Sequence, residues 1–275
     1  MSPIRQVCLV LGLAVLTVAN VFAADDDLDN AKWKIDANAW ISAPTGNFQS
    51  QSGKGNFDLQ RDFGFGNYAT FFAKTDWRFK RKHHLLLGVT PVLSSRTTTL
   101  SRTITWEDET YDVGAKANAD VRSLIITPCY QYDIFRRRTW SLGFQANLNV
   151  IYTDASLKLV GTVSGPGGSG SGSQERTGTF FAPLPAIGPV FHWYPVPSRS
   201  RIYVTGAITG MSFFGYGNFY SGNAVLGIPV SRSLDIRAGY LLGSRLKITG
   251  SNDQIGLRLT QKGPVVGVEY HWGIR

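Results

Sequence analysis

The stretch from Leu234 to Ile248, LDIRAGYLLGSRLKI, decides the fold because its side chains alternate in character. The residues on one face are Leu234, Ile236, Ala238, Tyr240, Leu242, Leu246 and Ile248. The residues on the other face are Asp235, Arg237, Gly239, Gly243, Arg245 and Lys247. An alternation with a period of two predicts a β-strand that has an apolar and a polar side.

The same alternation recurs along the chain and predicts ten strands in all. They are Trp33 to Ser42, Tyr68 to Phe79, His84 to Thr105, Val113 to Phe135, Thr139 to Thr162, Thr177 to Tyr194, Arg201 to Gly210, Asn218 to Val230, Leu234 to Thr249, and Ile255 to Trp272. The alternation of apolar and polar residues is interrupted within the fourth strand and near Gly263-Pro264, which predicts β-bulges there. Prolines 91, 128, 183 and 189 cannot donate a ladder hydrogen bond, so they predict bulges or frayed positions as well.

The connections between these strands alternate between tight basic turns and longer polar loops. The basic turns are Lys80-Arg81-Lys82, Arg136-Arg137-Arg138, Arg199 with Arg201, and Arg232. The loops are Ala43 to Asn67, Trp106 to Asp112, Val163 to Arg176, Met211 to Gly217, and Gly250 to Gln254, and the glycine-serine run from Gly165 to Ser173 predicts a flexible tip. Short turns on one side and long loops on the other are typical of an outer-membrane barrel.

The predicted fold is therefore an all-β, transmembrane, antiparallel up-and-down β-barrel of about ten strands, and eight to twelve are compatible with the pattern. No segment after the N-terminus has the apolar length of a membrane helix. Charged residues make up only 17% of the chain, against about 25% in an average soluble domain. These features leave strands as the way across a membrane.

The N-terminus has the layout of a cleaved signal peptide. Arg5 precedes an apolar run from Val7 to Val18, and small residues follow at Ala23 and Ala24. We predict a signal peptide at 1–23, a short periplasmic tail at 24–32 and a barrel at 33–275. Cys8 leaves with the signal peptide, so Cys129 has no intramolecular disulfide partner.

Aromatic residues on the apolar face gather near the strand ends that flank the short turns. They are Trp77, Phe79, Phe135, Trp140, Phe191, Trp193, Tyr270 and Trp272. Amphipathic rings at one level are what a membrane interface selects. The alternative is a soluble sandwich or barrel, in which aromatics at strand ends are not rare.

The chain resembles the outer-membrane β-barrel class that includes the small OmpA-like and OmpW-like proteins and, at ten strands, the omptins. The resemblance covers Trp33 to Trp272 and includes a final strand, Val266 to Trp272, that is similar to the assembly signal of these proteins. It implies the lipid bilayer of a cell outer membrane as the location and the outer-membrane assembly machinery as a partner. It implies no particular activity.

Charges of both signs fall on positions that face the predicted lumen near the turn side. They are Lys34, Asp36, Asp76, Arg78, Asp133, Asp235, Arg237 and Glu269. Because isolated charges in a low-dielectric interior are costly, we predict that they form an ion-pair network. The alternative is a water-filled passage whose lining needs no pairing.

Catalytic, metal and cofactor motifs are not found in the sequence. Of the four histidines, His83 and His84 fall in a short turn, and His192 and His271 fall near the predicted periplasmic ends of their strands. Omptin-like proteolysis would imply His and Asp near the outward mouth instead. The net charge of +9 is distributed over turns, so we expect no nucleic-acid partner.

Three function classes follow, in this order: a non-enzymatic structural or surface-interaction barrel with a largely filled lumen, a narrow porin-like channel, and a lipid- or peptide-processing enzyme.

Overall fold

The computed structural model describes residues 31–49, 56–106, 109–165, 168–195, 201–213, 217–242, 245–248 and 256–272. The strands are β1 (Trp33–Gln49), β2 (Asn56–Asp58), β3 (Tyr68–Lys80), β4 (His83–Thr99), β5 (Ile104–Trp106), β6 (Glu109–Tyr111), β7 (Lys116–Arg136), β8 (Trp140–Gly165), β9 (Gly168–Trp193), β10 (Tyr203–Phe213), β11 (Gly217–Pro229), β12 (Leu234–Leu241), β13 (Arg245–Ile248) and β14 (Gly256–Trp272). Among the described residues, no helix is long and apolar enough to cross a membrane. The predicted signal peptide and the tail up to residue 30 lie outside these ranges.

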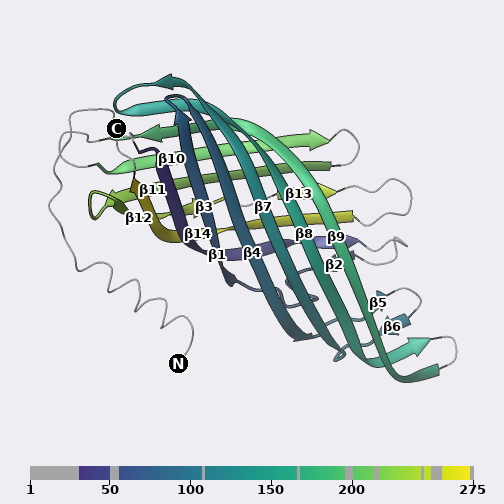
Figure 1. Cartoon of the computed structure of the whole chain (residues 1–275). Coiled ribbons are helices and arrows are strands. Elements are labelled where there is room, and N and C mark those ends of the chain that lie inside the picture. Colours follow the sequence, from purple (N-terminus) through teal and green to yellow (C-terminus); the bar gives the residue numbers. More distant parts are fainter. Residues whose placement is uncertain are drawn as a thin grey trace.

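The strands pair in chain order into a closed antiparallel barrel (Figure 1). The ring runs β1, β3, β4, β7, β8, β9, β10, β11, then β12 with β13, and β14, which pairs with β1. Since β12 and β13 occupy one place in the ring, the described residues form ten barrel strands, as the sequence predicted. Trp33 lies opposite Trp272 in the register, so the first and last strands begin and end at the same rim.

The outer face of the barrel carries a continuous apolar band. On β8 the band runs from Trp140 through Leu142, Phe144 and Leu148 to Tyr152, all exposed. Twelve residue steps at ~3.3 Å each, tilted by ~40°, span roughly 30 Å. That height matches the hydrocarbon core of a bilayer, whereas a soluble protein would bury such side chains.

An aromatic girdle marks the rim where the short turns lie. The Trp33 ring stacks on Trp77 at 5.4 Å and on Trp272 at 6.0 Å between ring centroids. On the neighbouring strands, Trp140 lies opposite Trp193 in the β8–β9 register, and both are exposed on the outer face. Such rings at one level are typical of the interface belt of a membrane barrel, and the short turns at this rim are typical of the periplasmic side, so we refer to it as the periplasmic rim.

The barrel wall continues beyond the apolar band on the opposite side. There β8 and β9 reach farthest (Figure 1), with β5 and β6 beside their far ends, and β7 ends level with β4, because Lys116 lies opposite Thr99. From Tyr152 to Gly165, β8 extends the barrel by a further ~30 Å at the same rise and tilt. We refer to these extensions of β7, β8 and β9 as the outer wall.

The outer wall corrects the prediction of a loop from Val163 to Arg176. The β8–β9 ladder is unbroken from Trp140 opposite Trp193 to Gly165 opposite Gly168, so most of the predicted flexible tip is paired strand. Glycine and serine have weak strand propensity, but ladder pairing overrides it here. The loop prediction for Ala43 to Asn67 was also too long, because β1 continues to Gln49 and pairs with β2.

Two smaller predictions also change. The strand predicted from His84 to Thr105 ends at Thr99, and β5 is a separate segment that pairs with β6. The register does shift near Gly263, as expected: Leu241 pairs with Gly263 and Arg245 with Thr260, so four residue steps lie opposite three steps of β14. Pro183 and Pro189 sit in the regular β8–β9 ladder without a bulge.

Candidate functional site

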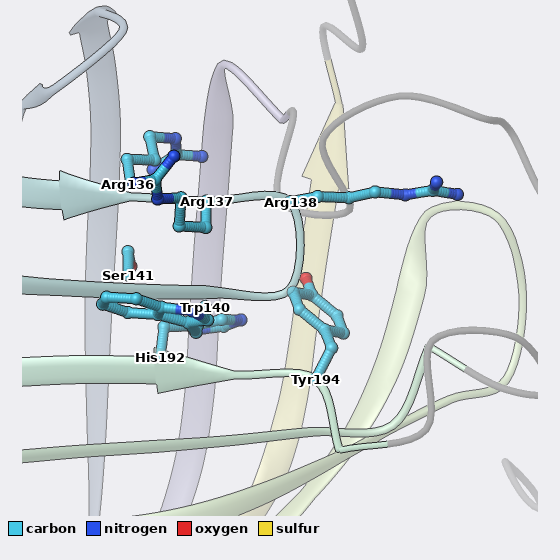
Figure 2. A pocket seen from close by; sticks show the side chains of 7 residues that line it. All are labelled: Arg136, Arg137, Arg138, Trp140, Ser141, His192 and Tyr194. Carbon is cyan, nitrogen blue, oxygen red and sulfur yellow. The ribbon is translucent and has the colours of Figure 1, made fainter.

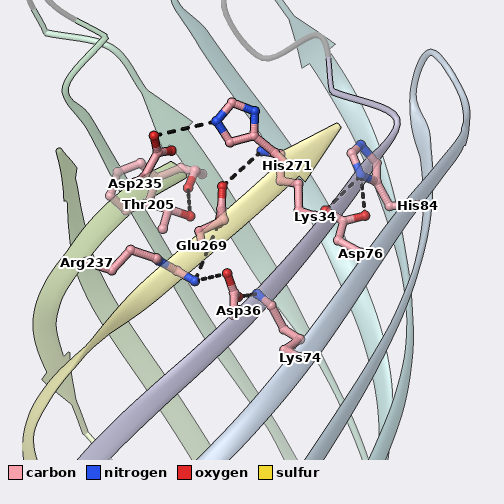
Figure 3. Close-up of polar contacts among 11 residues, drawn as sticks. Lys34, Asp36, Lys74, Asp76, His84, Thr205, Asp235, Arg237, Glu269 and His271 are labelled. Carbon is pink, nitrogen blue, oxygen red and sulfur yellow. Dashed lines mark hydrogen bonds and ion pairs between the residues drawn. The ribbon is translucent and has the colours of Figure 1, made fainter. Parts of the chain in front are cut away.

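A cluster of five paired charges lies along one wall of the lumen, on the neighbouring strands β12, β14, β1 and β3 near the rim with the short turns (Figure 3). Arg237 of β12 contacts Asp36 of β1, and its Nη1 lies 3.5 Å from Glu269 Oε2 of β14. Lys74 Nζ lies 3.3 Å from Asp36 Oδ2. Lys34 Nζ lies 3.9 Å from Glu269 Oε1. Three cations therefore surround two carboxylates.

The pairing register of the strands brings these charges together. Asp36 lies opposite Lys74 on one side and opposite Glu269 on the other, so cross-strand neighbours meet directly. Arg237 is opposite Gly267 and must reach across β14 to Asp36. A β-carbon at Gly267 would overlap the Asn38 side chain, so only glycine lets the first and last strands pack this closely here.

A second cluster lies on the adjoining wall around His84 of β4. His84 Nδ1 lies 2.9 Å from Asp76 Oδ1, and its Nε2 lies 3.4 Å from Asp133 Oδ2. Arg136 Nη1 donates to the same Asp133 oxygen at 2.7 Å, and Gln131 Nε2 donates to Asp133 Oδ1 at 2.9 Å. One buried carboxylate thus accepts two hydrogen bonds and lies within ion-pair distance of the imidazole. On the wall of the first cluster, His271 Nε2 of β14 lies 3.5 Å from Asp235 Oδ1 of β12.

A β-bulge builds this second cluster. The β7–β8 register shifts between Asp133 and Phe135, so that Ile134 and Phe135 are both exposed on the outer face. Strict alternation would have turned Arg136 outward. The extra residue returns Arg136 to the lumen beside Asp133, where its side chain is 2% exposed.

The structure brings most of the sequence-predicted lumen charges into these pairs. Arg78 lies on the same face of β3 as Asp76 and opposite His84 in the register. Lys74, His84, Arg136 and His271 also belong to the network, although the sequence reasoning did not name them as members. Lys74 could have been predicted to face the lumen, because it lies two residues before Asp76 on the same strand. Arg136 could not, because the sequence assigned it to a turn.

The network is nearly inaccessible to solvent. Side-chain exposure is 3% at Asp36, 7% at Arg237, 8% at Glu269 and 1% at Asp133, and 41% at Lys74. Further along the lumen Trp40, Thr209 and Phe219 are also buried. A wide water-filled passage would expose these side chains.

All four histidines lie in the periplasmic half of the barrel. His83 is on the outer face, where its ring contacts Tyr132 at 5.0 Å, and the other three take part in lumen contacts or line the periplasmic mouth. Within the described ranges, no three His, Cys, Asp or Glu side chains are grouped to hold a metal ion.

The outer wall has a hydrophobic core of its own on its inward face. Leu159 of β8 and Ala117 of β7 pack against Leu100 and Tyr111, each at most 1% exposed. The outward face is polar, where Lys158 Nζ lies 3.7 Å from Glu175 Oε2. Because the inward face of the outer wall is apolar and its outward face is polar, we infer that the outer wall lies in water rather than in lipid.

This barrel is similar in fold to solved structures of outer-membrane proteins. OmpT, the outer membrane protease of Escherichia coli, superposes with a TM-score of 0.59 over 93% of this chain and 100% of that chain, at 12% identity. The fold is that of an outer-membrane β-barrel. At this identity the likeness shows the fold of the outer-membrane barrel and nothing about activity.

Other outer-membrane barrels are similar at lower scores. The toluene transporter TodX of P. putida has a TM-score of 0.39 at 8% identity, over 92% of both chains. Ail, the attachment invasion locus protein of Yersinia pestis, has a TM-score of 0.31 at 9% identity, over 88% of this chain and 99% of that chain. No protein-family model and no curated protein sequence matches this barrel.

A short turn fastens the outer loops of the outer-membrane barrel to the outer wall. Asp58 Oδ1 accepts bonds from the backbone amides of Gln60 and Arg61, and Gly64 ends the turn with a φ of 65°. Asp62 is 1% exposed and accepts a 2.9 Å bond from Arg102 Nε. This pair joins the turn to the segment between β4 and β5.

We expect the Asp62–Arg102 pair to be pH-dependent in the acid range. Burial raises the pKa of Asp62, but bonds from Arg102 and the Asp58 amide outweigh it and lower the pKa below the ordinary 3.8. The stabilisation is therefore complete above pH 3.8 and is lost as the pH falls through the lower, folded value. An NMR titration of the Asp62 carboxyl carbon checks this, and a midpoint above 3.8 would contradict it.

Proposed function

We propose that this chain is a non-enzymatic protein of the outer membrane whose lumen is closed by paired charges and whose outer wall serves in surface interactions. The observation that carries the proposal is the burial of the lumen network. Asp36, Arg237 and Glu269 come from three adjoining strands, and their side chains are at most 8% exposed. Charges that are paired and buried in this way do not need a water-filled channel beside them.

The outer wall supports the second half of the proposal. Binding residues are often presented by segments that a rigid scaffold positions. Here the β7–β9 extensions stand beyond the apolar band, and their inner face has a packed core around Tyr111 and Leu159. A solvent-filled channel would not need this structure, whereas a protein that presents a surface would.

A second candidate, a narrow pore, is favoured by one observation. Lys74 lies in the charged cluster but is 41% exposed, so water reaches the network from its side. With three cations around two carboxylates, such a pore would prefer anions.

Single-channel recording of the refolded mature chain in planar bilayers tests the proposal. We expect no conductance steps from the wild type. The Arg237→Ala variant should give steps with cation preference, because the change uncovers Asp36 and Glu269. The Glu175→Ala variant, which changes an exposed pair on the outer wall, is the matched control and should stay silent. Reproducible anion-selective steps from the wild type would overturn the closed lumen in favour of the pore.

A further inference from the structure

A small basic cavity lies at the periplasmic rim, next to the lumen network, with which it shares Arg136 (Figure 2). It opens between the β7–β8 turn and the end of β9. Its lining residues are Arg136, Arg137, Arg138, Trp140, Ser141, His192 and Tyr194. The cavity is small, with a volume of about 10 Å³, room for roughly one water, and it opens to solvent, so a larger anion would lie at its mouth.

The cavity walls are held in place by contacts that need no ligand. The Arg137 amide donates to the Trp140 carbonyl at 2.8 Å, which closes the β7–β8 turn. The Tyr194 amide donates to the Thr139 carbonyl at 2.8 Å, which fastens the end of β9 to that turn. A site fixed in this way loses little conformational entropy when it binds.

Ring contacts hold the aromatic side chains that line the cavity in place. The His192 ring stacks on the Tyr203 ring with centroids 4.8 Å apart and 22° between planes, and Tyr194 lies 5.0 Å from His192. Gly227 makes room for the Tyr203 ring, because a β-carbon there would overlap it. Tyr194 is only 6% exposed, so its hydroxyl belongs to the floor.

The chemistry of the lining is that of an anion site. The lining includes three arginines, a serine, a histidine and a tyrosine, and none of the described lining residues is acidic. Arg136 is held by Asp133 at 2.7 Å, so its orientation is set before a ligand arrives. Arg137 and Arg138 are exposed, and Figure 2 shows the Arg138 side chain extended away from the other lining side chains into solvent, from which it can turn toward a ligand. Planar guanidinium groups match the oxygens of a phosphate.

We propose that this cavity binds a phosphate-class anion at the periplasmic face, either the headgroup of an anionic phospholipid or a soluble phosphate. Both sources offer the same phosphoryl oxygens to the arginines. Trp140 is 39% exposed and belongs to the aromatic girdle, which puts the entrance at the level of lipid headgroups.

The test measures thermal unfolding of the full mature chain with two probes. One probe is inorganic phosphate at constant ionic strength, and the other is phosphatidylglycerol in phosphatidylcholine nanodiscs. A ligand that binds only the folded barrel raises the unfolding midpoint. The variant Arg137→Gln with Arg138→Gln removes two charges from the entrance. The control Lys80→Gln with Arg81→Gln removes two charges from another exposed periplasmic turn.

We expect the wild type and the control to respond, and the cavity variant to bind about tenfold more weakly for each guanidinium lost. The single change Arg138→Gln should show an intermediate loss, which separates ligand loss from a folding defect. A response to phosphate identifies a soluble ligand, and a response to phosphatidylglycerol alone identifies the headgroup. If neither probe acts, or if control and cavity variants weaken equally, the site does not exist.

Discussion

Replacing Asp36 with alanine is expected to lower the free energy of unfolding by about 3–5 kcal/mol, because the change leaves a buried guanidinium unpaired. Arg237 is 7% exposed and would keep only the 3.5 Å contact with Glu269. Lys74 would lose its 3.3 Å partner as well. Urea titration of the barrel in micelles, followed by tryptophan fluorescence, measures the difference.

The control for this change is Glu175→Ala on the outer wall. Glu175 pairs with Lys158 at 3.7 Å, but the two side chains are 52% and 45% exposed. Exposed pairs contribute about 0–1 kcal/mol, so this variant should unfold almost as the wild type does. Equal effects at positions 36 and 175 would mean that water screens the lumen charges, and the packed lumen would be wrong.

The second large effect is expected in the outer wall. Leu159→Ala removes a side chain that is 1% exposed between β7, Leu100 and Tyr111, and such core truncations cost about 2–5 kcal/mol. Amide hydrogen exchange should rise in residues 100–119 while the membrane part of the barrel stays protected, because the wall has its own core.

The neighbouring change Val160→Ala is the control for the outer wall. Val160 is 38% exposed on the opposite face, so its truncation should change stability by less than about 0.5 kcal/mol. If Leu159→Ala leaves hydrogen exchange in the wall unchanged, the inward core does not hold the loops.

The barrel part of this fold could be predicted from the sequence because each strand faces two solvents. Lipid on one side and a crowded lumen on the other impose a strict period of two, as in Leu234 to Tyr240. The order of strands then follows from short connections. The network partners Lys34 and Glu269 could be expected as neighbours as soon as the first and last strands were taken to close the ring.

The outer wall could not be predicted in the same way. Its tip is built of glycine and serine, whose local preferences favour a loop, and only pairing with the facing strand makes it regular. The place of Arg136 depended on a single extra residue at the β7 bulge, which reverses every following side chain. The break in alternation predicted a bulge in this strand, and the structure confirms one, but the sequence did not give its position and so did not give the direction of Arg136.

The most direct test of the packed lumen is the reactivity of Cys129 in the mature chain. Cys129 lies on β7 opposite Leu86 and Asn147, and its side chain is buried. We expect a small, charged, thiol-specific reagent to label it only after the barrel is denatured, since a buried thiol has no contact with the reagent. Rapid labelling of the folded barrel would show that water fills the lumen and would contradict the account.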